Sequence, residues 1–254
     1  MVNQYIFNLR LKQFISFDMI WLIYLGLCLF HLFAIYTGQA QWVIFTLPFL
    51  MVSLMCVIIF YTKLKSYLSK WLLAAIFFGW LGDILLMKAG TIRLGLGMAA
   101  FILGHFAYIY IFSKEVSLKR KTHFLMEKTY LILPFIVFWF LTRVFLSDKV
   151  QAFPSSPIYF YGFIILLMSV MAINRWYAVS KLSWWMVWLG SLLFIISDTL
   201  LSIRLFVADF QGDKLLIMGT YLTAQGAIVY GCLKDELVRN GNRYFLRDKD
   251  IKQA

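Results

Sequence analysis

Eight long apolar runs constrain the fold of this chain more than any other feature of its sequence. They cover residues of about 19–36, 42–61, 71–88, 94–113, 130–147, 158–174, 184–206 and 215–233. A helix needs roughly 20 apolar residues to cross the hydrocarbon core of a bilayer. Apolar residues make up 62% of the chain, well above the roughly 45–50% of a water-soluble domain. The sequence therefore predicts an all-α integral membrane protein with eight transmembrane helices and excludes a water-soluble fold.

The 24 basic residues outnumber the 12 acidic ones, and most of them fall in loops on one side of the predicted helices. Cytoplasmic loops carry such an excess of lysine and arginine, so we expect both termini in the cytoplasm and, in a bacterium, a location in the plasma membrane. The basic residues are spread over loops instead of forming a stripe on a soluble domain, and we expect no nucleic acid partner. We predict a single membrane domain, 1–254, with halves of about 1–121 and 122–233 and a cytoplasmic tail, 234–254.

Several common sites are missing from the sequence. The three cysteines lie inside apolar runs, where thiols usually behave as small apolar side chains, so we expect no disulfide, no metal and no cofactor. The sequence also contains no Gly-x-Ser-x-Gly elbow, His-Glu-x-x-His motif, phosphate-binding loop or dinucleotide fingerprint. Acid/base chemistry on a lipid and proton-linked transport remain as the candidate functions.

Asp83 and Asp198 are the acidic residues that lie well inside apolar runs, whereas the others lie at run edges, in loops or in the tail. A charged side chain at the bilayer centre costs roughly 2.5–3.5 kcal/mol on insertion scales, so each must face the bundle interior, a polar partner or water. The surrounding segments, Gly82-Asp83-Ile84-Leu85-Leu86 and Ser197-Asp198-Thr199-Leu200-Leu201, are similar and lie in the third and seventh runs. We therefore predict a parallel four-plus-four internal repeat with both acids at corresponding depth.

Small and polar residues accompany both aspartates at helical spacing. Residues three or four apart share a helix face, and small residues there allow helices to approach closely. We predict that both carboxyl groups line one cavity in the outer half of the bilayer, within about 10 Å of each other if they act as a catalytic pair. The alternative is that each aspartate only joins helices by hydrogen bonds. The accompanying residues are Gly79, Gly82, Ser191, Ser197 and Ser202, with His105 and Tyr108 in the fourth run and Tyr221 and Gln225 in the eighth.

Four segments carry a resemblance to a known family: Phe78–Met87 (FGWLGDILLM), Gly95–Phe112, Gly190–Leu201 and Leu216–Gln225 (LIMGTYLTAQ). Over residues 60–233 the sequence resembles the YhhN-like lysoplasmalogenase family of eight-span membrane enzymes. The resemblance implies hydrolysis of the vinyl ether bond of 1-alkenyl lysophospholipids to a fatty aldehyde and glycerophosphocholine or glycerophosphoethanolamine. The implied partners are the lysophospholipid substrate and membrane lipids, and the implied site residues are Asp83, His105, Asp198, Tyr221 and Gln225.

Paired carboxyl groups suit this reaction. One acid donates a proton to the β-carbon of the vinyl ether, and an ionised partner stabilises the resulting oxocarbenium ion and deprotonates water, as in glycosidases. We expect Asp83 and Asp198 to be this pair, and the sequence does not decide which one is the acid. The residues expected to orient the substrate, the water or a carboxylate are His105, Tyr108, Tyr221 and Gln225. Those expected to allow close packing are Gly79, Gly82 and Ser197.

Two other functions remain open at this point. Buried acids and a parallel repeat also describe proton-linked secondary transporters, in which Asp83 and Asp198 would form the coupling site. A non-catalytic protein that binds or organises lipids would use the same aspartates to join its helices. Hydrolysis of an alkenyl lipid by the purified protein would separate the first function from the other two.

Overall fold

Helices account for nearly all of the described chain. The structure is a computed structural model that describes the backbone of residues 2–118, 124–150 and 155–251, and the side chains of residues 19–118, 124–150 and 156–236. Within these ranges no strand occurs, and eight helical segments are long and apolar enough to cross a membrane. The predicted all-α membrane fold with eight spans is confirmed.

The predicted runs coincide with the spanning helices, but several helices are longer than the apolar runs. α1 begins well before residue 19, α4 continues past residue 113, and α9 continues past residue 233. Lysine, arginine and glutamate are good helix formers, so a polar stretch marks the edge of the apolar run without ending the helix. The elements are α1 (Val2–Tyr36), α2 (Ala40–Thr62), α3 (Tyr67–Leu86), α4 (Thr91–Leu118), α5 (Phe124–Glu127), η1 (Thr129–Ile132), α6 (Leu133–Leu146), α7 (Ser155–Asn174), η2 (Arg175–Tyr177), α8 (Lys181–Phe206) and α9 (Asp213–Ile251).

Turn residues separate the helices where the sequence supplies them. Gly38 follows α1 with a φ of 70°, a conformation that costs glycine nothing and strains other residues. Ser66 begins α3 by accepting a hydrogen bond from the Ser69 backbone N–H at 2.9 Å, and Ser180 begins α8 in the same way with Ser183 at 3.3 Å. These serine caps satisfy backbone donors that a helix start leaves unpaired, and they fix the starts of the two helices that carry the aspartates.

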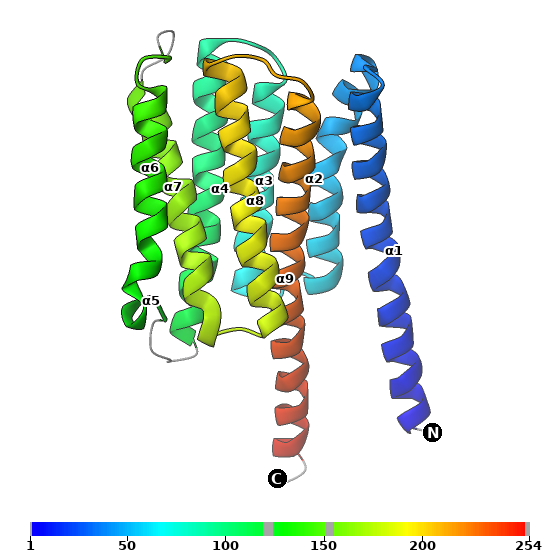
Figure 1. Ribbon diagram of the computed structural model, residues 1–254. Coiled ribbons are helices and arrows are strands. Elements are labelled where there is room, and N and C mark those ends of the chain that lie inside the picture. The colour runs from blue at the N-terminus through cyan, green and yellow to red at the C-terminus, as the bar shows by residue number, and fades with distance from the viewer. Residues whose placement is uncertain (1, 119–123, 151–154, 252–254) are drawn as a thin grey trace.

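Both chain termini lie at the same end of the bundle (Figure 1). We call it the terminal end; α3 and α8 start there, and they finish at the opposite end, which we call the far end. Asp83 and Asp198 each lie about 25 Å along their helices at 1.5 Å per residue, so both are nearer the far end. Termini on one side agree with an even number of spans, and their cytoplasmic location stays a prediction.

The closest helix pairs are α3 with α4 and α8 with α9. A Cβ at Gly104 of α4 would lie 3.1 Å from the Ala75 carbonyl oxygen, and one at Gly231 of α9 would lie 2.9 Å from that of Ser183. The two pairs therefore approach backbone to backbone. In addition, α4 packs on α7 and α9 packs on α2, so the fourth helix of each predicted half contacts the second helix of the other. This reciprocal packing is expected of a parallel repeat, whose duplication origin stays a prediction.

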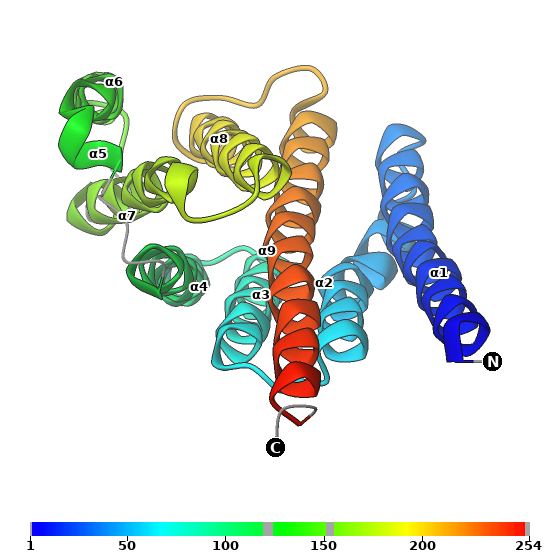
Figure 2. The same cartoon turned by 90° about the horizontal axis from the view of Figure 1, so that it is seen from below.

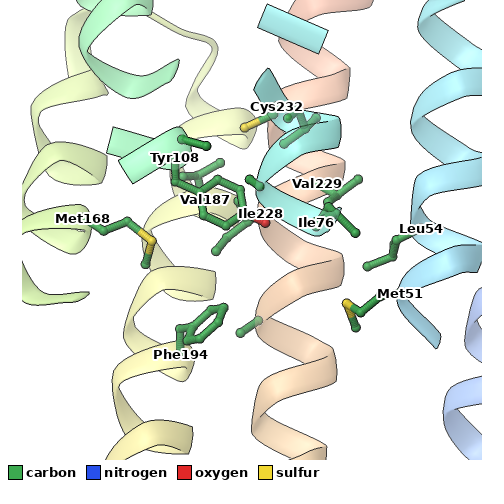
Figure 3. Close-up of a cluster of buried hydrophobic side chains, with 14 of the residues drawn as sticks. Met51, Leu54, Ile76, Tyr108, Met168, Val187, Phe194, Ile228, Val229 and Cys232 are labelled. Atoms are coloured by element: carbon green, nitrogen blue, oxygen red, sulfur yellow. The ribbon is translucent and has the colours of Figure 1, made fainter. Parts of the chain in front are cut away.

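The core lies between α2, α3, α4, α7, α8 and α9, where Figure 3 shows a cluster of buried side chains. Met51 and Leu54 of α2, Ile76 of α3, Met168 of α7 and Val229 of α9 are each fully buried in it. By contrast, α1 and α6 lie at opposite edges of the bundle (Figure 2). Leu146 is the buried residue of α6, so this helix is attached to the rest mainly through α7.

Candidate active site

Asp198 and Tyr161 form the centre of the candidate site. The Tyr161 hydroxyl on α7 donates a hydrogen bond to Oδ2 of Asp198 on α8. On its other side, the same hydroxyl lies 3.5 Å from Nε2 of His105 on α4. The His105 ring is buried, and its Nδ1 has no hydrogen-bond partner within the described part of the chain. Three helices thus bring a carboxyl, a phenol and an imidazole into one polar cluster.

Asp83 on α3 belongs to a second polar chain. The Tyr221 hydroxyl donates to Oδ2 of Asp83 at 3.0 Å, and Gln225 Nε2 donates to the Tyr221 hydroxyl at 3.4 Å. Gln225 Oε1 in turn accepts from the Tyr108 hydroxyl at 2.6 Å. Tyr108, Tyr221 and Gln225 are all buried, so each hydrogen bond satisfies a polar group that has no access to water. This chain joins α3, α4 and α9 and holds the Asp83 carboxyl group in one orientation.

Phe194 joins the two clusters. Its ring meets the His105 ring edge to face at 4.9 Å and the Tyr221 ring at 5.4 Å, both measured between centroids. Phe194 therefore links the two polar clusters into one assembly that contains both carboxyl groups.

Two hollows meet at Asp198. The first, of about 500 Å³ including the part open to the surroundings, lies between α6, α7 and α8; the second, of about 380 Å³ measured in the same way, lies between α3, α4, α7 and α8. Ile158, Tyr161, Asp198 and Ser202 line both. Asp198 is half-buried, so its carboxyl group is accessible from a largely apolar cavity.

The structure divides the sequence-predicted residues into two groups. Asp198 lines both hollows, whereas Asp83 lines neither and accepts a hydrogen bond from Tyr221. Neither of these two hollows is therefore the expected cavity lined by both carboxyl groups. Neither hollow is lined by the four residues expected to orient the substrate, which are His105, Tyr108, Tyr221 and Gln225. His105 lies beside the Tyr161 hydroxyl, and the hydrogen bonds of the other three lead to Asp83. Their position suits the orienting of carboxyl groups better than contact with substrate.

The residues expected to allow close packing lie against the site. A Cβ at Gly79 would lie 3.3 Å from Gln225 Nε2, and one at Gly82 would lie 2.8 Å from the Phe101 ring. Ser197 donates a hydrogen bond to the Ile217 carbonyl oxygen at 3.0 Å and so ties α8 to α9. Side chains larger than hydrogen at Gly79 and Gly82 would displace the residues that hold Asp83.

Sequence reasoning missed Tyr161 and a buried ion pair. Glu115 and Arg175 were expected at helix edges or in loops, but Arg175 Nε lies 2.6 Å from Glu115 Oε2, and both side chains are fully buried. Arg175 Nη2 also donates to Ser183 Oγ at 3.1 Å. Both residues do lie at helix ends, but their pairing was missed because α4 continues through Glu115 to Leu118 and meets the end of α7 there. The opposite charges of two residues at adjacent helix ends were the sequence signal that could have identified the ion pair. No sequence signal identified Tyr161.

A family model, described as the YhhN family, matches residues 40–232. No curated protein and no solved structure shows significant similarity to the chain. The matched region contains α2 to α8, most of the spanning part of α9, and all the residues of both polar clusters. Among the described residues, no group of three or more histidine, cysteine or acidic side chains could hold a metal ion. Since the match covers most of an integral multi-pass membrane protein, the chain belongs to the YhhN family, the lysoplasmalogenase family.

Proposed function

We propose that the protein hydrolyses the vinyl ether bond of lysoplasmalogens, releasing a fatty aldehyde and a glycerophospho-alcohol. The observation that carries the proposal is an aspartate, Asp198, accessible from an apolar hollow between membrane helices. Membership of the YhhN family supports the same reaction. A single-chain lipid carries its enol ether where the polar glycerol meets the apolar chain. A carboxyl group among apolar walls offers a polar and an apolar environment in the same way.

Asp198 is the general acid in this mechanism. Its Oδ2 accepts the hydrogen bond of Tyr161, which leaves Oδ1 to carry the proton toward the substrate. Transfer of that proton to the β-carbon of the vinyl ether produces an oxocarbenium ion, and a water molecule adds to its α-carbon. The Asp198 carboxylate takes the proton that this water loses, so the acid is regenerated. The hemiacetal then collapses to the aldehyde and the alcohol, and one water is consumed for each bond cleaved.

Asp83 acts on the same cation from outside the two hollows. In this proposal the carboxylate form of Asp83 stabilises the positive charge that develops on the oxocarbenium ion near Asp198. A fixed charge in low-dielectric surroundings stabilises such a transition state more than it would in water. Tyr221, itself bonded to Gln225, holds the Asp83 carboxyl group in place. His105 and Tyr161 position Asp198 in the corresponding way.

The test is aldehyde release from 1-alkenyl lysophosphocholine by the full-length protein in lipid nanodiscs, followed by mass spectrometry. Asp198→Asn is expected to lower kcat by about 10²–10⁴-fold, the usual contribution of a general acid, and Asp83→Asn is expected to lower it less. Asp209→Asn is the matched control, because the Asp209 side chain is 84% exposed at the far end. Equal kcat values for Asp198→Asn and Asp209→Asn would contradict the mechanism.

Deuterium labelling tests the route of cleavage. In D₂O, protonation at carbon places one deuterium on the carbon next to the aldehyde carbonyl, which prompt trapping as a hydrazone preserves. The 1-alkyl analogue, which has no double bond to protonate, should remain intact. Absence of aldehyde in any lipid, together with proton-coupled uptake of a solute into proteoliposomes, would instead support the transporter with Asp83 and Asp198 as its coupling site.

A further inference from the structure

We propose that Arg143, at the rim of the hollow between α6, α7 and α8, binds the phosphate of a single-chain phospholipid that enters sideways from the bilayer. The enzymatic consequence rests on the proposed function, but the binding of lipid does not. Arg143 is exposed and lines this hollow together with Asp198. A phosphate-binding residue and a candidate acid therefore share one cavity.

Two aromatic side chains hold the Arg143 guanidinium at the rim. Its Cζ lies 5.8 Å from the centroid of the Trp139 ring and 5.6 Å from that of the Tyr159 ring. Trp139 Nε1 donates to the Tyr159 carbonyl oxygen at 3.1 Å, which joins α6 to α7 beside the guanidinium. A planar guanidinium fixed in this way can present two parallel N–H groups to a phosphate.

Arg143 has no carboxylate partner. In the described ranges the salt bridges are those of Arg175 with Glu115 and of Arg204 with Asp209 and Asp213. The positive charge at the rim is therefore available to an anion from outside the protein. Near the surface of a bilayer, the abundant anion is the phosphate of a lipid headgroup.

Toward the far end the lining of the hollow carries polar side chains beside the apolar Leu146 and Ile158, and toward the terminal end it is largely apolar. Because α6 rises toward the far end, Arg143 lies about 7.5 Å nearer that end than Phe138 at 1.5 Å per residue. On α8, Asp198 and Thr199 lie nearer the far end than Ile195, and on α7 Tyr161 lies nearer it than Ile165. A single-chain phospholipid has the same order: its phosphate meets Arg143, its glycerol and enol ether meet Asp198, and its chain follows the apolar wall.

The position of α6 opens this hollow toward the lipid. Both α6 and α8 line it, but α6 packs mainly on α7, while α8 packs mainly on α9 and then on α7. Figure 2 shows α6 at the edge of the bundle, outside α7. A lipid can thus reach the hollow from the membrane without crossing the core.

An arginine beside aromatic rings at a membrane surface can also serve as an interface anchor, and Lys149 provides the control for that role. Lys149 is exposed at the same end of α6, and its Nζ lies 5.4 Å from the Phe145 ring centroid, but it does not line the hollow. Anchoring alone would make the two residues equivalent, whereas phosphate binding distinguishes Arg143.

The experiment measures the binding of two non-hydrolysable lipids to the full-length protein in nanodiscs. Arg143→Gln is expected to weaken binding of 1-alkyl lysophosphocholine about tenfold, as for loss of a hydrogen-bonded charge, and to leave binding of 1-alkylglycerol unchanged. Arg143→Lys should restore part of the affinity, and Lys149→Gln should change neither. Diacyl phosphocholine, with the same headgroup and a second chain, should compete weakly. Equal melting temperatures confirm that the variants are folded.

The kinetic arm uses the cleavable lipids. For 1-alkenyl lysophosphocholine, Arg143→Gln should raise KM about tenfold with little change in kcat, and for 1-alkenylglycerol it should change neither constant. An equal loss with both lipids, an equal effect of Lys149→Gln, or tighter binding of diacyl phosphocholine would overturn the assignment. Phosphate-dependent binding through Arg143 without aldehyde release would instead retain this site and overturn the proposed hydrolysis.

Discussion

At the scale of single residues, the proposed mechanism gives the hydrogen bond from Tyr161 the role of fixing which oxygen of Asp198 faces the substrate. Tyr161→Phe removes this bond and leaves the carboxyl group free to rotate. In the proposed mechanism Asp198 becomes a carboxylate as it gives up its proton, and a hydrogen bond to a charged group is worth about 1.5–3 kcal/mol. We therefore expect kcat for the alkenyl lipid to fall about 10- to 100-fold while KM changes little. Steady-state kinetics on the folded variant measure both constants.

Tyr177→Phe is the control for this change, because the Tyr177 hydroxyl donates to Glu127 Oε2 at 3.1 Å near the terminal end. It removes a tyrosine hydroxyl without touching either hollow. If Tyr161→Phe and Tyr177→Phe have the same kcat, Tyr161 does not position the acid.

The two aspartates could be predicted from the sequence, whereas their environments could not. An acid inside an apolar run is costly enough to identify Asp83 and Asp198 without coordinates. Tyr161 carries no such cost, since tyrosine is an ordinary residue of membrane helices, and the chain has 14 of them. Its contact with Asp198 depends on how α7 packs beside α8, which no spacing within one helix predicts. The same limit applies to the contact of Asp83 with Tyr221 of α9.

At the scale of elements, the Glu115–Arg175 ion pair fastens α4 to the junction of α7 and η2. Both side chains are fully buried, and removing one partner of such a pair typically costs about 3–5 kcal/mol. We expect Glu115→Ala to lower the free energy of unfolding by this amount, measured by denaturant unfolding in detergent. Since the pair lies near the terminal end, kcat of the folded fraction should be unchanged.

Asp209→Ala serves as the comparison, because Asp209 is exposed and lies 3.5 Å from Arg204 Nε. An exposed ion pair contributes about 0–1 kcal/mol, so this variant should unfold almost like the wild type. A similar loss for both variants would mean that the buried pair contributes no more than a surface contact.

Helix positions were predictable from hydropathy, and helix ends were not. Each predicted run lies within a described helix or ends within two residues of one, because the cost of exposing backbone to hydrocarbon leaves the helix as the available form. The extensions of α4 and α9 were missed, since a charged residue such as Lys114 or Lys234 leaves the hydrocarbon while the helix continues. The burial of Glu115 was missed for the same reason.

At the scale of the whole molecule, an even number of spans places both termini on one side of the membrane, and the charge distribution predicts the cytoplasmic side. A fluorescent reporter that matures only in the cytoplasm should therefore fluoresce when fused after Ala254. It should stay dark when fused after Phe210, in the far-end connection between α8 and α9. The opposite pattern would invert the topology and place the hollows at the cytoplasmic leaflet.

The loose attachment of α6 has a consequence for how the protein meets its surroundings. Because α6 packs mainly on α7, we expect the cavity between α6 and α8 to be open at its side, where acyl chains of neighbouring lipids would complete its wall. The volume around Asp198 is then shared between polypeptide and bilayer, and bilayer thickness and lateral pressure become determinants of its shape. By the proposed route, a lipid dissolved in that leaflet would exchange into the cavity by diffusion in two dimensions, and its long chain would never have to pass through water.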